Sequence, residues 1–265
     1  MRSYQLVGTE KIELVEAPTP EPGAHEVLVR VKACSVCSRS DLIYYKYVGV
    51  KERIGKGHFG HEVSGVIEQV GEAVEGWQPG QRVFLRTSMP PGGFADYTLA
   101  RLISVGRLPD HMTFVEGAPA QQVPIAVNST RNIKAGDYVV ILGQGSAGLL
   151  LTQMCRLRGA AKIVTGDLYD NRCQLSRQLG ADVAVNVTRE NIDQAVKEAL
   201  GGRAPDVTFD AVGIPSVVRK CVDLVRTEGL VVIFGSHHVE EEVSFNLVQW
   251  ESKAITIHMS NEGSD

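Results

Sequence analysis

Residues 137–150 read DYVVILGQGSAGLL, and this stretch decides the fold of the second half of the chain. The apolar run 138–142 is typical of a short buried strand. A glycine-rich turn of the form GxGxxG follows it directly, and a helix-like segment, 147–158, comes next. A strand, this glycine spacing and a helix in succession predict a dinucleotide-binding turn.

The residues of this turn have separate expected roles. Gly143 permits the tight turn, Gly145 lets the backbone approach a pyrophosphate, and Gly148 allows the helix to pack on the sheet. The helix N-terminus at Ser146 and Ala147 offers unpaired N–H groups and a partial positive charge to the anion. An ordinary glycine-rich turn can show the same spacing, so a second feature is needed.

That feature is an acid. Asp167 ends the next predicted strand, 162–167, about 24 residues beyond Gly143. A carboxylate at this point can accept hydrogen bonds from an adenosine ribose, and it would repel a 2′-phosphate. We therefore expect the cofactor to be NAD and not NADP.

The chain beyond Asp167 keeps alternating between helices and strands. Helices are expected at 170–179, 191–200 and 216–225, and strands at 182–187, 206–213 and 230–236. Five apolar strands separated by helices imply right-handed crossovers and a parallel sheet covered on both faces. The second half is predicted to be a doubly wound α/β domain, to which residues 254–260 could add a sixth strand.

The first half is rich in β-structure. In the stretch 25–33, Val27, Val29 and Val31 alternate with other residues at the period of a half-buried strand. Residues 63–70 form a similar run, and prolines and glycines separate such runs as turns require. We expect a compact β barrel or sandwich at 1–125 and the α/β domain at 126–265.

Composition excludes several classes of protein. The 265 residues carry a formal charge of −4 and no basic run, which argues against a nucleic-acid partner. No stretch approaches the ~20 apolar residues that span a bilayer, and the first residues do not resemble a signal peptide. The five cysteines are odd in number and scattered, unlike a disulfide framework. A cytoplasmic location without a membrane partner is expected.

Cys34 and Cys37 form a single CxxC pair. Without a second pair, this spacing could be a redox motif, a metal site or two buried thiols, and buried thiols are common. The spacing by itself leaves these three alternatives open.

The neighbouring residues carry a family resemblance. The runs VLVRVKACSVC at 27–37, GHEVSGVIEQVGEAVEGWQPGQRV at 60–83, GGFADY at 92–97 and the turn at 137–150 resemble the zinc-containing medium-chain alcohol and polyol dehydrogenases. The resemblance covers nearly the whole chain in the same order. It implies a GroES-like β-barrel catalytic domain followed by a Rossmann domain, with substrate bound in the cleft between them.

The resemblance also implies roles for single residues. Cys37 and His61 fall on two catalytic zinc ligands, and Glu62 falls on the carboxylate beside them. Ser40 falls on the hydroxyl that relays the substrate proton, and Asp41 on the acid that follows it.

Further residues fall on the cofactor site of the family. Asp167 matches the acid that binds the ribose, and Arg172 matches a basic residue near the same ribose. The cofactor site is also expected to include four residues at the ends of later strands: Gly213, Phe234, Gly235 and Ser236.

The sequence departs from the family around the metal. An extra residue lies between Cys37 and Ser40, so either the loop bulges or Ser38 stands in the place of the thiolate. The usual third ligand is an acid or a cysteine, but Gln121 occupies its position here. Because a neutral amide is a poor zinc ligand, the site is expected to use Glu62 or water, or to hold the metal weakly.

Other departures concern the proton path and the ends of the domains. Ile43 stands where many members have the outer histidine of the relay, so the proton must leave by another route. Residues 84–94 contain no cysteine, so no structural zinc is expected. The chain ends at Asp265, and the segment that returns to the catalytic domain in the family is expected to be missing.

The leading hypothesis is a zinc-dependent oxidoreductase that transfers a hydride between an alcohol or polyol, or its carbonyl product, and NAD. A zinc-free reductase of the quinone-oxidoreductase type and a dinucleotide-binding protein without turnover are the alternatives. The resemblance also favours a homodimer or homotetramer formed through the edge of the Rossmann sheet.

Overall fold

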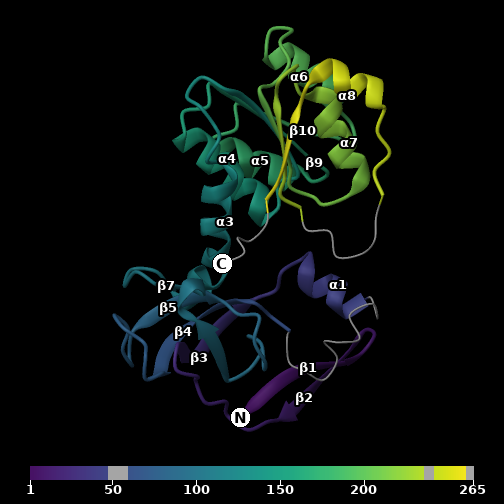
Figure 1. Cartoon of the computed structure of the whole chain (residues 1–265). Coiled ribbons are helices and arrows are strands. Elements are labelled where there is room, and N and C mark those ends of the chain that lie inside the picture. The colour runs from purple at the N-terminus through teal and green to yellow at the C-terminus, as the bar shows by residue number, and fades with distance from the viewer. Residues whose placement is uncertain (47–58, 236–241, 261–265) are drawn as a thin grey trace. The chain divides into compact units, whose positions relative to one another are not determined.

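The structure is a computed structural model that describes residues 1–46, 59–235 and 242–260 (Figure 1). Contacts between residues divide the chain into two compact units, Met1–Gln122 and Val123–Asp265. None of the helices in the described ranges is long and apolar enough to cross a membrane. All five cysteines are free thiols.

The first unit is built on an antiparallel sheet with the strand order β6-β3-β4-β5-β7. Its strands are β3 (Glu26–Ser35), β4 (Glu62–Val70), β5 (Arg82–Arg86), β6 (Tyr97–Arg101) and β7 (Val105–Arg107). A separate hairpin is formed by β1 (Arg2–Gly8) and β2 (Lys11–Glu16). The long central strands β3 and β4 provide most of the core of this unit.

The alternating pattern predicted along β3 explains this core. Val27 and Val29 are fully buried and Val31 packs against the same cluster, while Arg30 points outward and forms an ion pair with Glu68. Burying one face of each strand removes apolar surface from water, which is the main term that stabilises the sheet.

Short helices connect these strands. They are α1 (Ser40–Lys46), α2 (Phe114–Gly117) and the 3-10 turns η2 (Leu102–Ser104) and η3 (Ala118–Gln121). α2 begins with a capping box, in which Thr113 and Glu116 satisfy each other's backbone N–H groups. The sequence analysis did not predict these helices, because each is too short to show a 3.6-residue period.

The second unit holds a parallel sheet of six strands, ordered β10-β9-β8-β11-β12-β13. The strands are β8 (Tyr138–Leu142), β9 (Lys162–Asp167), β10 (Val183–Asn186), β11 (Val207–Asp210), β12 (Leu230–Ile233) and β13 (Thr256–Met259). The chain order reverses between β8 and β11. In open α/β sheets, ligands bind at the carboxyl ends of the strands beside such a reversal.

Helices cover both faces of this sheet (Figure 1). They are α3 (Gln122–Ser129), α4 (Ser146–Leu157), α5 (Asp170–Gln178), α6 (Ile192–Ala199), α7 (Pro215–Leu224) and α8 (Leu247–Lys253). α6, α7 and α8 contribute side chains to one apolar cluster, and α3 and α4 contribute to the cluster on the opposite face.

The structure confirms the predicted fold class of an antiparallel β unit followed by a doubly wound α/β unit. The sixth strand expected at 254–260 is confirmed as β13, which runs parallel to β12. Two of the predicted strands extend further than the strands in the structure. The strand expected at 230–236 ends at Ile233, and the strand expected at 206–213 ends at Asp210. Residues 211–213 and 234–235, which were expected in these strands, follow the strand ends instead, and Ser236 lies outside the described residues.

Candidate metal and nucleotide sites

Three potential metal ligands meet at one end of β4. The Cys37 thiol, an imidazole nitrogen of His61 and a carboxylate oxygen of Glu62 all lie within 4.8 Å of one another. The pairing of β3 with β4 explains why, because Ser35 is the register partner of Glu62. Cys37 lies two residues after the end of β3 and His61 lies one residue before the start of β4, so the two residues emerge side by side.

The turn before β4 has an unusual conformation. Gly60 has a φ of +79°, which favours glycine, and a Cβ at this position would lie 2.6 Å from the Phe94 ring. The tight packing around Gly60 fixes the direction in which the next residue, His61, leaves the turn.

Asp41 organises the three ligands without belonging to them. Its buried carboxylate accepts hydrogen bonds from the backbone N–H of Cys37, at 2.8 Å, and of Gly60, at 3.3 Å. It also lies 3.6 Å from Nδ1 of His61, whose Nε2 lies 4.0 Å from Glu62. A carboxylate behind a histidine fixes the ring and leaves the other nitrogen for a metal. The sequence analysis gave Asp41 no role of its own.

The protonation of the cluster follows from its charges. Burial raises the pKa of the Cys37 thiol, but the contact with His61 and backbone N–H groups outweigh burial and bring the pKa below its usual value. Burial lowers the pKa of His61, but Asp41 and the Cys37 thiolate outweigh it and raise that pKa to about 10. Both shifts favour the charged forms of the pair, a thiolate beside an imidazolium.

The donor set fits zinc. Zinc is bound in proteins by cysteine sulfur, histidine nitrogen and carboxylate oxygen, and catalytic sites use three protein ligands. Cys37, His61 and Glu62 supply one of each kind. Two ligand atoms about 2.0 Å from a tetrahedral ion are roughly 3.3 Å apart, so the 4.0 Å between His61 and Glu62 needs only a small closure.

Two glutamines lie at the junction of η3 and α3. Gln122 donates a hydrogen bond of 2.6 Å from Nε2 to Oε1 of Glu62, and both side chains are buried. Gln121, predicted at the position of the third ligand, is also buried. Its Oε1 has no hydrogen-bond partner among the residues that the structure describes.

The remaining predicted residues of this site lie on α1 and its approach. Ser40 is the first residue of α1 and is largely buried, and Ile43 is buried on the same helix. Ser38 is exposed, while Cys37 joins the ligand cluster. The loop thus accommodates its extra residue without displacing the thiol.

The glycine-rich turn lies between β8 and α4. Gly143 has a φ of +96°, and a Cβ on Gly148 would lie 1.9 Å from the carbonyl oxygen of Gly143, so neither position has room for a side chain. A Cβ on Gly145 would meet nothing within 4 Å. The turn is open at Gly145, and Ser146 and Ala147 begin α4 beside it.

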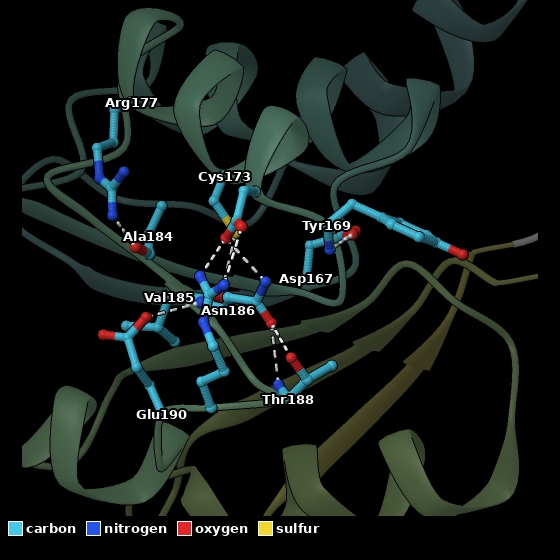
Figure 2. Close-up of polar contacts among 11 residues, drawn as sticks. Asp167, Tyr169, Cys173, Arg177, Ala184, Val185, Asn186, Thr188 and Glu190 are labelled. Atoms are coloured by element: carbon cyan, nitrogen blue, oxygen red, sulfur yellow. Dashed lines mark hydrogen bonds and ion pairs between the residues drawn. The ribbon is translucent and has the colours of Figure 1, made fainter.

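Asp167 and the turn are joined by hydrogen bonds. The Asp167 carboxylate accepts from the backbone N–H of Gln144, at 2.7 Å. It also accepts from the backbone N–H of Tyr169, at 3.0 Å (Figure 2). Nη1 of Arg172 lies 3.6 Å from the same carboxylate, and its guanidinium lies over the Tyr169 ring. The structure thus brings together the two residues expected near the ribose.

Other predicted cofactor residues follow β11 and β12. Gly213 donates its N–H to Asp210, and a Cβ on Gly235 would lie 2.1 Å from the nitrogen of Gly213. The N–H groups of Phe234 and Gly235 also bond to the carbonyl of Asp210. The two turns therefore pack backbone against backbone. Ser236 lies outside the described residues.

A polar network beside Asp167 was missed by the sequence analysis. Asn186 pairs with Asp167 in the register of β9 and β10. Its side chain donates to Asp170 and accepts from both the N–H and the hydroxyl of Thr188, and Arg189 forms an ion pair with Asp170 (Figure 2). An asparagine at the end of a strand was the available signal, because such a side chain often bonds to the following turn.

Comparison with known proteins gives a consistent result. Residues 23–123 match the alcohol dehydrogenase GroES-like domain, and residues 147–265 match the zinc-binding dehydrogenase family. Human sorbitol dehydrogenase is 28% identical over 265 residues, covering 88% of this chain and 74% of that protein. The (R,R)-butanediol dehydrogenase of Bacillus subtilis is 29% identical over 257 residues, covering 84% and 73%.

Solved structures share the fold. The crystal structure of a putative zinc-binding dehydrogenase from Sinorhizobium meliloti, bound to NADP, superposes with a TM-score of 0.84 at 23% identity. The match covers 97% of this chain and 83% of that one.

Proposed function

The chain belongs to the zinc-binding, medium-chain alcohol dehydrogenase family, and from this premise we propose that it transfers a hydride between an alcohol or polyol and NAD. The observation that carries the proposal is the meeting of the Cys37 thiol, the His61 imidazole and the Glu62 carboxylate. The names of the relatives, sorbitol dehydrogenase and butanediol dehydrogenase, support a polyol or diol as the substrate class.

We assign one zinc ion to Cys37, His61 and Glu62. Zinc in such a site acts as a Lewis acid, which lowers the pKa of an alcohol and favours its alkoxide. The thiolate and the carboxylate offset the charge of the ion, and Asp41 holds His61 with Nε2 directed toward Glu62. A second, structural zinc is not part of the proposal, because residues 84–94 contain no cysteine.

Ser40 is proposed to relay the proton of the substrate alcohol, because its hydroxyl can accept that proton while it passes its own proton onward. Ser40 begins α1, three positions after Cys37 and directly before Asp41. Its side chain is largely shielded from water. Ile43 cannot carry the proton further, because its side chain has no titratable group. The proton therefore leaves Ser40 by a route that does not use position 43.

NAD is proposed to bind at the carboxyl ends of β8 and β9. Gly145 leaves space for a pyrophosphate at the N-terminus of α4, and Asp167 offers its carboxylate to the ribose. The negative charge of Asp167 supports NAD over NADP, whose 2′-phosphate it would repel. Phe234 and Gly235 are proposed to face the nicotinamide, which accepts the hydride.

We further expect a homodimer or homotetramer in the cytoplasm. β13 is the last strand in the order of the parallel sheet, and an edge strand can pair with a second copy. Size-exclusion chromatography with light scattering measures this state directly.

Elemental analysis of zinc in the purified protein tests the proposed function. About one zinc per chain is expected in the parent, and Cys37→Ala and His61→Ala are expected to lose it. Cys34→Ala is the matched control, because it removes the other thiol of the CxxC pair and should keep the zinc. The zinc-loaded parent should form NADH with sorbitol or butanediol. A parent that binds NAD but no zinc would refute the proposal.

A further inference from the structure

The Glu62 carboxylate is deeply buried and needs a partner. Glu62 is 1% exposed, and a buried carboxylate without hydrogen bonds is costly because it has lost its water. The orientation of the Glu62 carboxylate is also important, since a carboxylate that binds a metal must direct one of its oxygens toward the ion. The groups that touch Glu62 therefore decide whether it can act as a ligand.

Gln122 touches Glu62 directly. The 2.6 Å hydrogen bond from Nε2 to Oε1 joins residues 60 positions apart in the sequence. A carboxylate only accepts hydrogen bonds, so the amide must present its NH2 group to Glu62 and turn its oxygen away. That oxygen, Oε1 of Gln122, has no hydrogen-bond partner in the described part of the chain. The contact with Glu62 thus sets the orientation of the Gln122 amide, although this orientation leaves Oε1 of Gln122 without a hydrogen bond.

The neighbouring glutamine behaves differently. Gln121 is also buried, but the amide that donates to the Glu62 carboxylate belongs to Gln122 and not to Gln121. Gln122 is held from both sides, because it begins α3 and directly follows η3, which packs against β3, β4 and β5. These two elements therefore position Gln122 beside Glu62 at the start of β4.

We propose that Gln122 is a positioning residue for the metal site, which orients the Glu62 carboxylate toward the ion through its Nε2–H. This inference rests on the proposed function. A hydrogen bond to a charged acceptor is stronger than one between neutral groups, and it constrains the carboxylate without adding a charge. An amide can hold a ligating carboxylate in this way while it remains outside the coordination shell itself.

Zinc affinity of Gln122 variants tests the inference. Gln122→Met keeps the length of the side chain and removes the donor, and we expect zinc to bind about 10–100-fold more weakly. Gln122→Leu also removes the donor and adds no charge, so it should weaken zinc to a similar degree. Gln153→Ala is the matched control, since it removes an amide donor that bonds to the backbone of its own helix, and zinc affinity should not change. Competition with a chromophoric chelator gives each dissociation constant.

Two further readouts separate positioning from a structural defect. The absorption spectrum of the cobalt-substituted protein should change in Gln122→Met, because the spectrum reports the geometry of the ligands. NAD affinity and the circular dichroism spectrum should stay as in the parent, which shows that the variant is folded.

The outcomes are distinguishable. If the parent holds one zinc and Gln122→Met binds it within twofold with an unchanged cobalt spectrum, the inference is wrong and the proposed function stands. If Gln122→Met does not fold, Gln122→Leu decides in the same assay. A parent that binds no zinc overturns both.

Discussion

The glycine-rich turn at 143–148 and the cluster of Cys37, His61 and Glu62 differ in how many segments of the chain form them. The turn uses six consecutive residues and an acid on the next strand, and its polar groups bond to one another, as Gln144 does to Gly143, Thr152 and Asp167. The cluster uses Cys37, the adjacent pair His61 and Glu62, and a glutamine from a third segment. A site built from one segment is specified locally, whereas a site built from three depends on strand register.

The largest expected effect contrasts two glycines of the nucleotide turn. Gly148→Ala places a methyl group 1.9 Å from a backbone carbonyl, so we expect a loss of about 3 kcal/mol of stability and of measurable NAD binding. Gly145→Ala is the matched change, because its methyl group meets only open space in the protein. Gly145→Ala should leave the stability of the protein nearly unchanged and lower only its affinity for NAD. Thermal unfolding and NAD titration measure both quantities, and equal destabilisation by the two variants would contradict this account.

A second change acts on the metal cluster only. Asp41→Asn removes the negative charge behind His61 and leaves one acceptor for the N–H groups of Cys37 and Gly60. We expect zinc affinity to fall about 10–100-fold, as for other groups that support a histidine ligand. NAD affinity should not change, because Asp41 and the glycine-rich turn belong to different compact units. Chelator competition checks the first result, and an unchanged zinc affinity would show that Asp41 only orders the loop.

The pH dependence of zinc binding is the third prediction. In the metal-free protein the pKa of His61 is raised to about 10 and that of Cys37 is lowered, and both shifts favour the state in which the pair carries one proton, on His61. Zinc must displace that proton, and affinity should rise about tenfold per pH unit between about pH 7 and pH 9 and level off above His61's pKa. Calorimetry in buffers of different ionisation enthalpy counts the protons released. We expect one proton to be released for each zinc bound. Release of two protons would mean that Cys37 is a thiol in the metal-free protein, and release of none would mean that His61 is neutral.

The smallest expected effect concerns the choice of cofactor. Asp167→Asn removes the charge that would face a 2′-phosphate and keeps an acceptor for one of the two N–H groups, those of Gln144 and Tyr169. Two charges 4 Å apart in water interact by about 1 kcal/mol, so the preference for NAD over NADP should shrink roughly fivefold. The ratio of the two dissociation constants is the measurement. A ratio that does not move would place the specificity in another residue.

The sequence analysis predicted the α/β unit well because the deciding signals are local. Glycine spacing, strand length and the acid of β9 are all visible within a window of about 30 residues. The adjacency of Asp41 to His61 could not be predicted from spacing, since it depends on the turn at Gly60 and on the pairing of Ser35 with Glu62. The role proposed for Gln122 could not be predicted for the same reason, because Gln122 begins α3 and its partner Glu62 lies 60 residues earlier, at the start of β4.

The boundary between the compact units has a consequence during synthesis. Every residue assigned to the metal site, from Cys37 to Gln122, lies in the first unit, and the whole dinucleotide-binding sheet follows it. A ribosome adds about 5–20 residues per second, so the ligands emerge on the order of 10 s before the last strand of that sheet. The proposed metal ligands are therefore all synthesised before the strands of the nucleotide-binding sheet are complete.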